Sequence, residues 1–413
     1  MPYHAGPTLR DLRRPIPDMH NPCEIHTITS GPHNHNHAYP TCRTWSRDGK
    51  CVFIESSGPG PDGKVEEGRG HILSIDIESG GVKYLASMVG GCYGFDYSPG
   101  ANCIAYLDGS GHELHVLNLD TMTSGTVFHE PAGVMCGPLS ISRDGTRIVY
   151  WSMFPSAENR YFDDYITVIF ALDVDPVDCG LVTGPWIVEA YPRRKGKTWD
   201  RNHRDGIHVN HPQINPADKD HICYSHEMLG ATPDGSVAMC RLWEVRADGD
   251  DNRYLVRQVA GLHFTHEVIA PDGKSLVFPY MHGVGQVDFG TLERRSLYYN
   301  SDCCPGHLTV SPDQKWIAGD TWGDWKDDQG RAVQSVMMFD VETRKCAHLC
   351  WITRSRGHPG HPHPNFSPGG TKIAFTHLVD GFCQVAYIDV SCIMANWDTV
   401  AQGRGEEASP EWR

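Results

Sequence analysis

Short β-rich runs separated by turn residues recur along the whole chain. Seven of them follow turns of the Ser-Pro-Asp-Gly kind near residues 46, 98, 142, 215, 270, 311 and 367. The runs read CVFIES, CIAYLD, RIVYWS, HICYSH, SLVFPY, WIAGDT and KIAFTH. A compact strand after a hairpin turn, repeated about every 50 residues, is typical of propeller blades. The pattern predicts an all-β fold, with a single seven-bladed β-propeller domain over residues 1–413.

Composition agrees with this fold and narrows the possible partners. Glycine (43 residues) and proline (28) are plentiful, and helix signals are scarce. A length of 413 residues ordinarily suggests two or three domains, but one propeller reaches this size. The net charge of −15 argues against nucleic acid as a partner, and the absence of a long apolar segment argues against a membrane.

The chain ends and the cysteines bear on the compartment. No apolar secretory segment opens the chain, and the 15 cysteines show neither a small-scaffold spacing nor a CxxC pair. We therefore expect reduced thiols in a cytoplasmic protein and no cysteine-bound zinc site. The sequence gives no indication of the oligomeric state.

One position of the repeat carries unusual side chains. The residues four places before the turns are Cys42, Gly94, Pro138, His211, His266, His307 and His363. If this segment is the inner strand of each blade, equivalent positions surround the central channel and the four histidines converge. Core packing does not explain histidine at four consecutive blades, since propeller channels are usually lined by small or apolar residues. The repeat therefore predicts a functional site in the channel.

The last blade begins with a dense histidine stretch. His358, His361 and His363 fall close together in a segment rich in proline and glycine. In an extended chain His361 and His363 share one face, and the Pro-Gly turn can bring His358 back toward them. Neutral imidazole is the commonest protein ligand of transition metals, so the stretch indicates a metal clasp. The alternative is a solvated loop.

Two other clusters leave their roles open. Before blade one the chain carries several histidines, and either this is a surface loop or His37, Tyr39 or Arg43 reaches the channel mouth and contacts substrate. The basic run over 191–201 is either a solvated face or a loop that steers an anionic ligand. Trp322 and Trp325 either stack on a sugar ring or fill the blade.

From blade four onward the sequence resembles the oligogalacturonate lyases. The matching segments are His211-Pro-Gln, Tyr224-Ser-His-Glu227, Cys240-Arg-Leu-Trp243, His266-Glu267, His307-Leu with Ala318-Gly-Asp320, and His361-Pro-His-Pro-Asn-Phe-Ser-Pro. The resemblance implies a seven-bladed propeller that holds a divalent metal, usually manganese, and acts on pectin-derived acidic oligosaccharides. Over blades one to three the likeness is mostly the general repeat.

The resemblance also implies roles for particular residues. His307, His361 and His363 would be metal ligands with His358 as the fourth, where the family carries glutamine. An all-histidine set also suits zinc and other transition metals, so the metal stays open between manganese and these. His266 would be the proton-abstracting base and Arg241 an electrostatic partner. His211 would orient the substrate or a neighbouring histidine, and Glu227 and Glu267 would fix histidine tautomers.

The implied reaction suits these residue types. β-Elimination removes the C5 proton of a uronate, next to its carboxylate, and expels the C4 oxygen. A divalent cation and a guanidinium stabilise the charge that develops on the carboxylate, and neutral imidazole can accept the proton. One alternative is a lyase with the same residues that acts on glucuronate-containing oligosaccharides, of the rhamnose-glucuronate or ulvan kind. The other is a noncatalytic interaction propeller.

Overall fold

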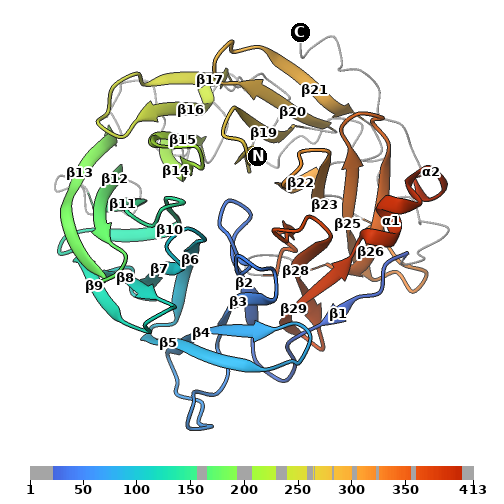
Figure 1. Cartoon of the computed structure of the whole chain (residues 1–413), viewed down its shortest axis with the longest axis horizontal. Coiled ribbons are helices and arrows are strands. Elements are labelled where there is room, and N and C mark those ends of the chain that lie inside the picture. The colour runs from blue at the N-terminus through green and yellow to red at the C-terminus, as the bar shows by residue number, and fades with distance from the viewer. Residues whose placement is uncertain are drawn as a thin grey trace.

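Seven antiparallel sheets surround a common axis as the blades of a propeller (Figure 1). The structure is a computed structural model that describes residues 22–155, 165–192, 207–228, 240–257, 264, 266–280, 283–299, 305–321, 325–354 and 360–401. The all-β, seven-bladed fold predicted from the repeat is therefore confirmed. Each predicted turn lies directly before the second strand of its blade.

Blades one to three contain four strands each, from the axis outward. Blade one consists of β2 (His35–His37), β3 (Cys51–Ser56), β4 (Arg69–Asp76) and β5 (Val82–Val89). Blade two consists of β6 (Cys92–Ser98), β7 (Cys103–Asp108), β8 (Glu113–Asn118) and β9 (Ser124–His129). Blade three consists of β10 (Val134–Ile141), β11 (Arg147–Pro155), β12 (Tyr165–Asp175) and β13 (Gly180–Pro192).

Blades four to six continue the ring. Blade four consists of β14 (Ile207–Asn215), β15 (Asp218–Met228), β16 (Cys240–Arg246) and β17 (Arg253–Arg257). Blade five consists of β18 (Val268–Ile269), β19 (Ser275–Tyr280), β20 (Gly283–Asp288) and β21 (Arg294–Tyr299). Blade six consists of β22 (Pro305–Val310), β23 (Trp316–Thr321), β24 (Trp325–Lys326), β25 (Ala332–Asp340) and β26 (Cys346–Thr353), and β25 pairs with the three others beside it.

The two ends of the chain complete blade seven together. Its strands are β27 (Asn365–Phe366), β28 (Lys372–Val379), β29 (Phe382–Asp389) and, outermost, β1 (His26–Thr27) from the N-terminal side. The register pairs His26 with Tyr387 and Thr27 with Ala386, which closes the ring (Figure 1). Two short helices follow, α1 (Ser391–Ala395) and α2 (Trp397–Val400). Among the described residues, neither helix has the length and apolar character needed to span a membrane.

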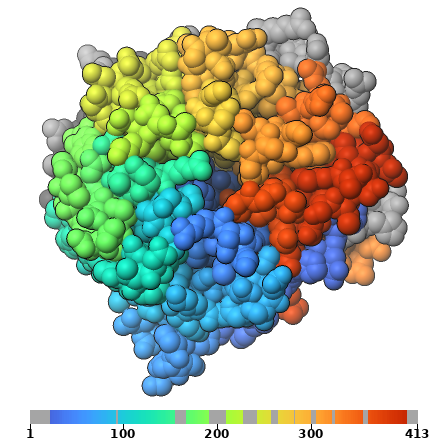
Figure 2. Space-filling model, in the orientation of Figure 1, coloured from blue at the N-terminus to red at the C-terminus, as the bar shows by residue number. Residues whose placement is uncertain are grey.

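Apolar side chains fill the spaces between adjacent blades. Alternating strand residues point to opposite faces of each sheet, so a blade buries one set against each neighbour. The second strands are buried on both faces, and Tyr150 of blade three and Tyr224 of blade four have no exposed surface. The space-filling surface leaves only a narrow hollow at the centre of the ring (Figure 2). Side chains at the axis are therefore close enough to form a site.

In six of the seven blades a polar residue lies two positions after the channel residue, and several of these side chains tie neighbouring inner strands together. In chain order these residues are Thr44, Asp96, Ser140, Gln213, Thr309 and Asn365, and blade five has Val268 at this position instead. Asp96 accepts hydrogen bonds from the backbone N–H groups of Arg43 at 2.7 Å and Ile141 at 2.9 Å. Gln213 donates to the carbonyl of Glu267 at 2.8 Å. These bonds fix the relative heights of adjacent blades and hence of the channel side chains.

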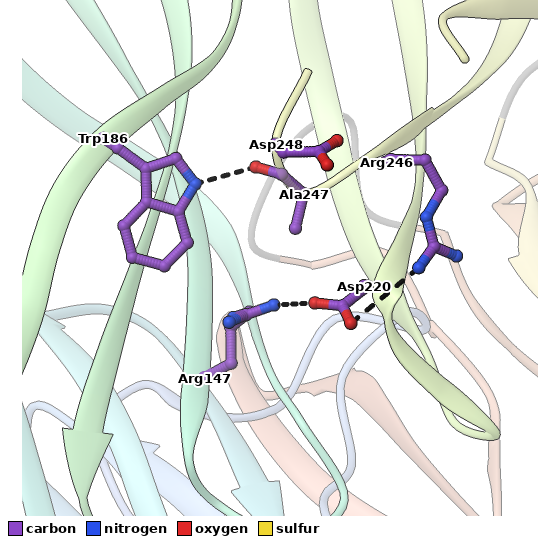
Figure 3. A pocket seen from close by; sticks show the side chains of 6 residues that line it. All are labelled: Arg147, Trp186, Asp220, Arg246, Ala247 and Asp248. Atoms are coloured by element: carbon purple, nitrogen blue, oxygen red, sulfur yellow. Dashed lines mark hydrogen bonds and ion pairs between the residues drawn. The ribbon is translucent and has the colours of Figure 1, made fainter. Parts of the chain in front are cut away.

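A charged cavity of about 240 Å³ lies between blades three and four, lined by residues of β11, β13, β15, β16 and the turn after β16. Asp220 lies between the guanidinium groups of Arg147 and Arg246 (Figure 3). Arg147 also contacts the ring of Trp186, whose indole N–H donates to the carbonyl of Ala247 at 2.7 Å. The ion pair between Arg147 and Asp220 links blades three and four. None of the channel histidines lines this cavity.

Candidate active site

Three of the four channel histidines share a left-handed backbone conformation. The residues His211, His266 and His363 have φ angles of 50°, 51° and 49°. In blade four this residue lies in a register shift of the β14–β15 ladder, between Asn210 and Gln213. Histidine is one of the few residue types that visit this left-handed region, and such bulges re-aim a side chain. The inner strands therefore present imidazoles to the axis instead of to a neighbouring blade.

The four histidines of blades four to seven form a continuous row. Their ring centroids are 5.7 Å apart for His211 and His266, 4.0 Å for His266 and His307, and 4.2 Å for His307 and His363. His307 is completely buried, whereas His266 keeps part of its surface exposed. The side chains that the repeat placed at equivalent positions therefore do converge, although their roles are not established by this proximity.

Three histidines are arranged as a metal-binding group. The ligand atoms of His307, His361 and His363 all lie within 4.8 Å of one another. His363 is buried and His361 is half-buried, so the group is accessible from one side. Three imidazoles at this spacing fit a divalent transition metal, and small movements would bring the nitrogen atoms to bonding distance.

Asp320 on β23 holds two of these histidines. Its carboxylate is 2.8 Å from Nδ1 of His307, and it accepts the backbone N–H of His307 at 2.7 Å and that of His363 at 3.4 Å. Burial opposes ionisation of Asp320, but the charge of His307 and its hydrogen bonds keep the pKa of this carboxyl below its ordinary value. When Nδ1–H donates to Asp320, Nε2 of His307 is the nitrogen that can bind a metal.

Tyr39 reaches the row of histidines from blade one. Its ring stacks on His211 at 5.1 Å and lies edge-on to His363 at 4.9 Å and His307 at 5.8 Å. Its hydroxyl is 3.2 Å from Nε2 of His211. The expectation that Tyr39 reaches the channel fits this position, and its contact with substrate stays a prediction.

His37 contacts the backbone of the metal-binding group. Nε2 of His37 lies 2.6 Å from the carbonyl of His363, and Nδ1 lies 2.8 Å from the hydroxyl of Thr376. Burial lowers the pKa of His37 to about 4, so the ring is neutral with its proton on Nε2, and Nδ1 accepts from Thr376. Both nitrogens are engaged by the protein, whereas the sequence suggested a contact with substrate, which stays a prediction.

Arg43 is also engaged within the protein. Its guanidinium donates to both carboxylate oxygens of Asp96, at 3.1 and 2.7 Å, and to the carbonyl of Ile141. The side chain retains 34% exposure. Arg43 therefore links blades one, two and three, and its predicted contact with substrate would have to use the exposed part of the group.

Several predicted residues lie where the structure gives no side-chain description. His358, Trp322 and nearly all of the 191–201 basic run are outside the described residues. Arg241 belongs to β16 and Glu227 to β15, but their side chains are also outside the description. The side chain of Glu267 is fully buried beside His266. The roles predicted for these residues therefore stay predictions.

From the sequence, Asp320 either accepts from a histidine or ends its strand, and the strand pairing decides for the first. The β22–β23 register pairs Leu308 with Gly319, which sets Asp320 beside His307 across the hairpin. Folding the sequence around the predicted turn near residue 311 would have found this pairing. A carboxylate directly across a hairpin from a buried histidine is therefore worth counting in such a repeat.

Comparisons with solved structures agree with the fold. An oligogalacturonate lyase in complex with manganese superposes with a TM-score of 0.69 at 19% identity, covering 91% of this chain and 95% of that one. An oligogalacturonate lyase from Vibrio parahaemolyticus gives 0.67 at 17% identity, covering 89% and 94%. The β-propeller domain of Cps50 (Swd1) from Myceliophteria thermophila gives 0.53 at 12% identity, covering 87% and 100%. At these identities the likeness establishes the propeller fold.

Sequence comparison adds the family. No curated protein matches the chain significantly. The family model described as oligogalacturonate lyase matches residues 201–392. This range holds all four channel histidines, His361 and Asp320. The match therefore covers blades four to six and most of blade seven, the same part of the chain in which the histidine segments resemble oligogalacturonate lyases.

Proposed function

We propose that this protein is a metal-dependent lyase that cleaves oligogalacturonate by β-elimination. The observation that carries the proposal is the row of imidazoles at the axis. In this row the ring centroids of His266 and of His307, which belongs to the metal-binding group, are 4.0 Å apart. This places a candidate base directly beside a candidate site for the substrate carboxylate. The family match over residues 201–392 supports the same reaction class.

His307, His361 and His363 would hold the divalent metal. When bound, such an ion would neutralise the uronate carboxylate and so make the neighbouring C5 proton more acidic. Asp320 would keep His307 in the tautomer that presents Nε2. The solved relative in complex with manganese makes this ion the first to test, and the imidazole set also suits zinc.

His266 would accept the C5 proton. Its ring is half-buried, so one side can face a substrate while the other packs against His307. As C5–H breaks, its electron pair forms the C4–C5 double bond and the C4–oxygen bond breaks, which releases the leaving sugar as an alkoxide that takes up a proton. Tyr39 and His211 border the same space and would position the sugar ring. Arg241 is the proposed partner for the carboxylate charge.

The test combines metal content with product formation. We expect one equivalent of metal in the purified protein and chelator-sensitive growth of the ultraviolet absorbance of unsaturated uronate. His266→Ala should keep the metal and lose about a hundred- to ten-thousandfold in kcat. Cys42→Ala, at the equivalent position of blade one, is the matched control and should keep both. Full activity in His266→Ala would refute the assignment of the base.

Substrate identity is tested in the same assay. Turnover of glucuronate-containing oligosaccharides without turnover of oligogalacturonate would keep the site and replace the proposed substrate. A protein that binds no metal and cleaves neither substrate would instead be the interaction propeller considered above. Both outcomes differ from the result that would refute only the assignment of His266 as the base, namely full activity of His266→Ala.

A further inference from the structure

Blade six carries an aromatic cluster, formed by Trp325 of β24 with His348 and Trp351 of β26. His348 stacks on Trp351 with ring centroids 4.5 Å apart. Trp325 lies edge-to-face with Trp351 at 5.8 Å and with His348 at 6.4 Å. Trp351 is buried, while Trp325 and His348 keep part of their surface exposed. The cluster is therefore a supported aromatic surface and not a closed core.

A chain of hydrogen bonds connects this cluster to the metal-binding group. Asp320, which holds His307, is followed by Thr321, whose hydroxyl accepts the backbone N–H of Ser335 at 2.9 Å. The hydroxyl of Ser335 is in turn 2.7 Å from Nδ1 of His348. Residues of one continuous network thus support both the aromatic cluster and the histidines at the axis.

The strand register places Trp325 on the metal side of blade six. Asp320 pairs with Val336 of β25, and three residues further along β25 Val333 pairs with Trp325. Trp325 is five positions after Asp320 along the chain, so their Cα atoms are at most about 18 Å apart. A single oligosaccharide of several units can span such a distance from the histidines to the cluster.

Two cationic side chains lie at the same end of the blade. Lys326 follows Trp325 and pairs with Ala332, whose carbonyl accepts the backbone N–H of Arg354 at 3.0 Å. Lys326 is exposed and Arg354 is partly exposed. Acidic residues follow Lys326, of which Asp327 pairs with Arg331 and Asp328 is exposed, so the local charge is mixed and Lys326 and Arg354 are the groups that suit a carboxylate of the ligand.

We propose that Trp325 is a sugar-stacking residue of a distal subsite, which binds acidic sugar units beyond the unit held at the histidines. This inference rests on the proposed function, because it concerns the same substrate. An indole face is flat and apolar and suits the C–H face of a pyranose ring, while Lys326 and Arg354 suit the carboxylates. Trp351 and His348 fix the orientation of the indole. The subsite therefore favours longer substrates over the disaccharide.

Steady-state kinetics on oligogalacturonates of two to five units test the subsite. Trp325→Ala should raise KM for the longest substrates about three- to tenfold and leave disaccharide kinetics unchanged. Trp325→Phe should recover most of the lost affinity, and it serves as the readout if the alanine variant does not fold. Tyr254→Ala, an exposed aromatic at the rim of blade four, is the control and should change nothing. An equal effect at all lengths, or no effect, would overturn the proposal.

A binding measurement separates this proposal from the proposed function. If the wild-type protein cleaves no oligogalacturonate, the proposed function fails, and titration of tryptophan fluorescence with the pentasaccharide decides about the subsite. Saturable binding that weakens in Trp325→Ala and persists in Tyr254→Ala would retain the subsite. Binding that is equal in all three proteins, or no binding, would reject it.

Discussion

Blades one to three and blades four to seven use one backbone position in two ways. In the first group the channel residues are Cys42, Gly94 and Pro138, and in the second they are four histidines. Gly94 and three of those histidines share a positive φ angle. Cys42, Pro138 and His307 do not share that conformation, so the equivalent positions differ in backbone as well as in side chain. The repeat supplies equivalent places around the axis, which hold small packing residues in one group of blades and imidazoles in the other.

Two buried carboxylates repeat this contrast. Asp96 is fully buried and binds the guanidinium of Arg43 together with backbone N–H groups of two adjacent blades. Asp320 is equally buried, but its side-chain partner is the imidazole of His307. One carboxylate holds blades together, and the other orients a candidate ligand. Substitutions at the two positions should therefore separate stability from metal binding.

The largest contrast is expected between channel residues of the two groups. His307→Ala should abolish metal binding and lyase activity, because it removes a central ligand of the three-histidine group. Cys42→Ala should keep both and cost about 1 kcal/mol of unfolding free energy. Metal content by elemental analysis, together with activity, checks the pair. Loss of metal in both variants would show that metal binding does not depend only on the channel residues of blades four to seven.

Asp96→Ala should give the largest loss of stability. It leaves the guanidinium of Arg43 without its buried counter-charge, and breaking such a pair costs about 3–5 kcal/mol. Part of that cost will be offset, because the side chain of Arg43 is 34% exposed to water. Chemical denaturation measures the change, and the folded fraction should still bind metal. A stable variant with lost metal would reverse the assignment.

Acid should lower the free energy of unfolding through two buried histidines at the junction of blades one and seven. Burial lowers the pKa values of His35 on β2 and His377 on β28 to about 4, against about 6.5 in an unfolded chain. Above pH 6.5 both states are neutral and stability is complete. As the pH falls from 6.5 toward 4, only the unfolded chain takes up protons, so stability falls by up to about 1.4 kcal/mol per pH unit for each histidine.

This acid dependence is measured by denaturation of chelator-treated protein, so that metal release does not contribute. His377→Gln should flatten the slope by the share of one histidine, and His129→Gln, at an exposed position, should leave it unchanged. A wild-type slope that persists in full in His377→Gln would assign the acid sensitivity elsewhere.

The smallest effect is expected at Asp320. Asp320→Asn keeps the size of the side chain but no longer offers a charged acceptor to Nδ1 of His307. Substitutions of such supporting groups typically weaken metal affinity about ten- to a hundredfold. Competition with a coloured chelator measures the affinity, and Asp96→Asn is the matched control. Unchanged affinity would mean that His307 is oriented by packing alone.

The sequence predicted the blades and the convergence of the channel histidines because both follow from a regular repeat. Position relative to the turn was enough to place His211, His266, His307 and His363 around one axis. Closure of blade seven by β1 was not predicted, since a strand of two residues carries almost no periodic signal. Side-chain contacts between different blades also leave no periodic signal in the sequence, because they depend on tertiary structure.

Arg43 and His37 illustrate the limit of this reasoning. The sequence left the segment that holds them open between a surface loop and a stretch that reaches the channel mouth and contacts substrate. Arg43 is held by Asp96 of blade two, and His37 by His363 and Thr376 of blade seven. These partners are 53 or more residues away in sequence. A local pattern shows that a polar group lies near the axis, but not which partner it has there.

The pairing of β1 with β29 also has a consequence for assembly of the protein during its synthesis. β1 is made before every other described strand, and its partner β29 after all of them. His361 and His363 lie in the same late segment, and His363 is held by His37 from the early one. A nascent chain therefore contains most of its blades well before it can assemble the metal-binding group. A chain that stops before blade seven lacks His361 and His363, two of the three candidate ligands, so such truncated products should not bind the metal.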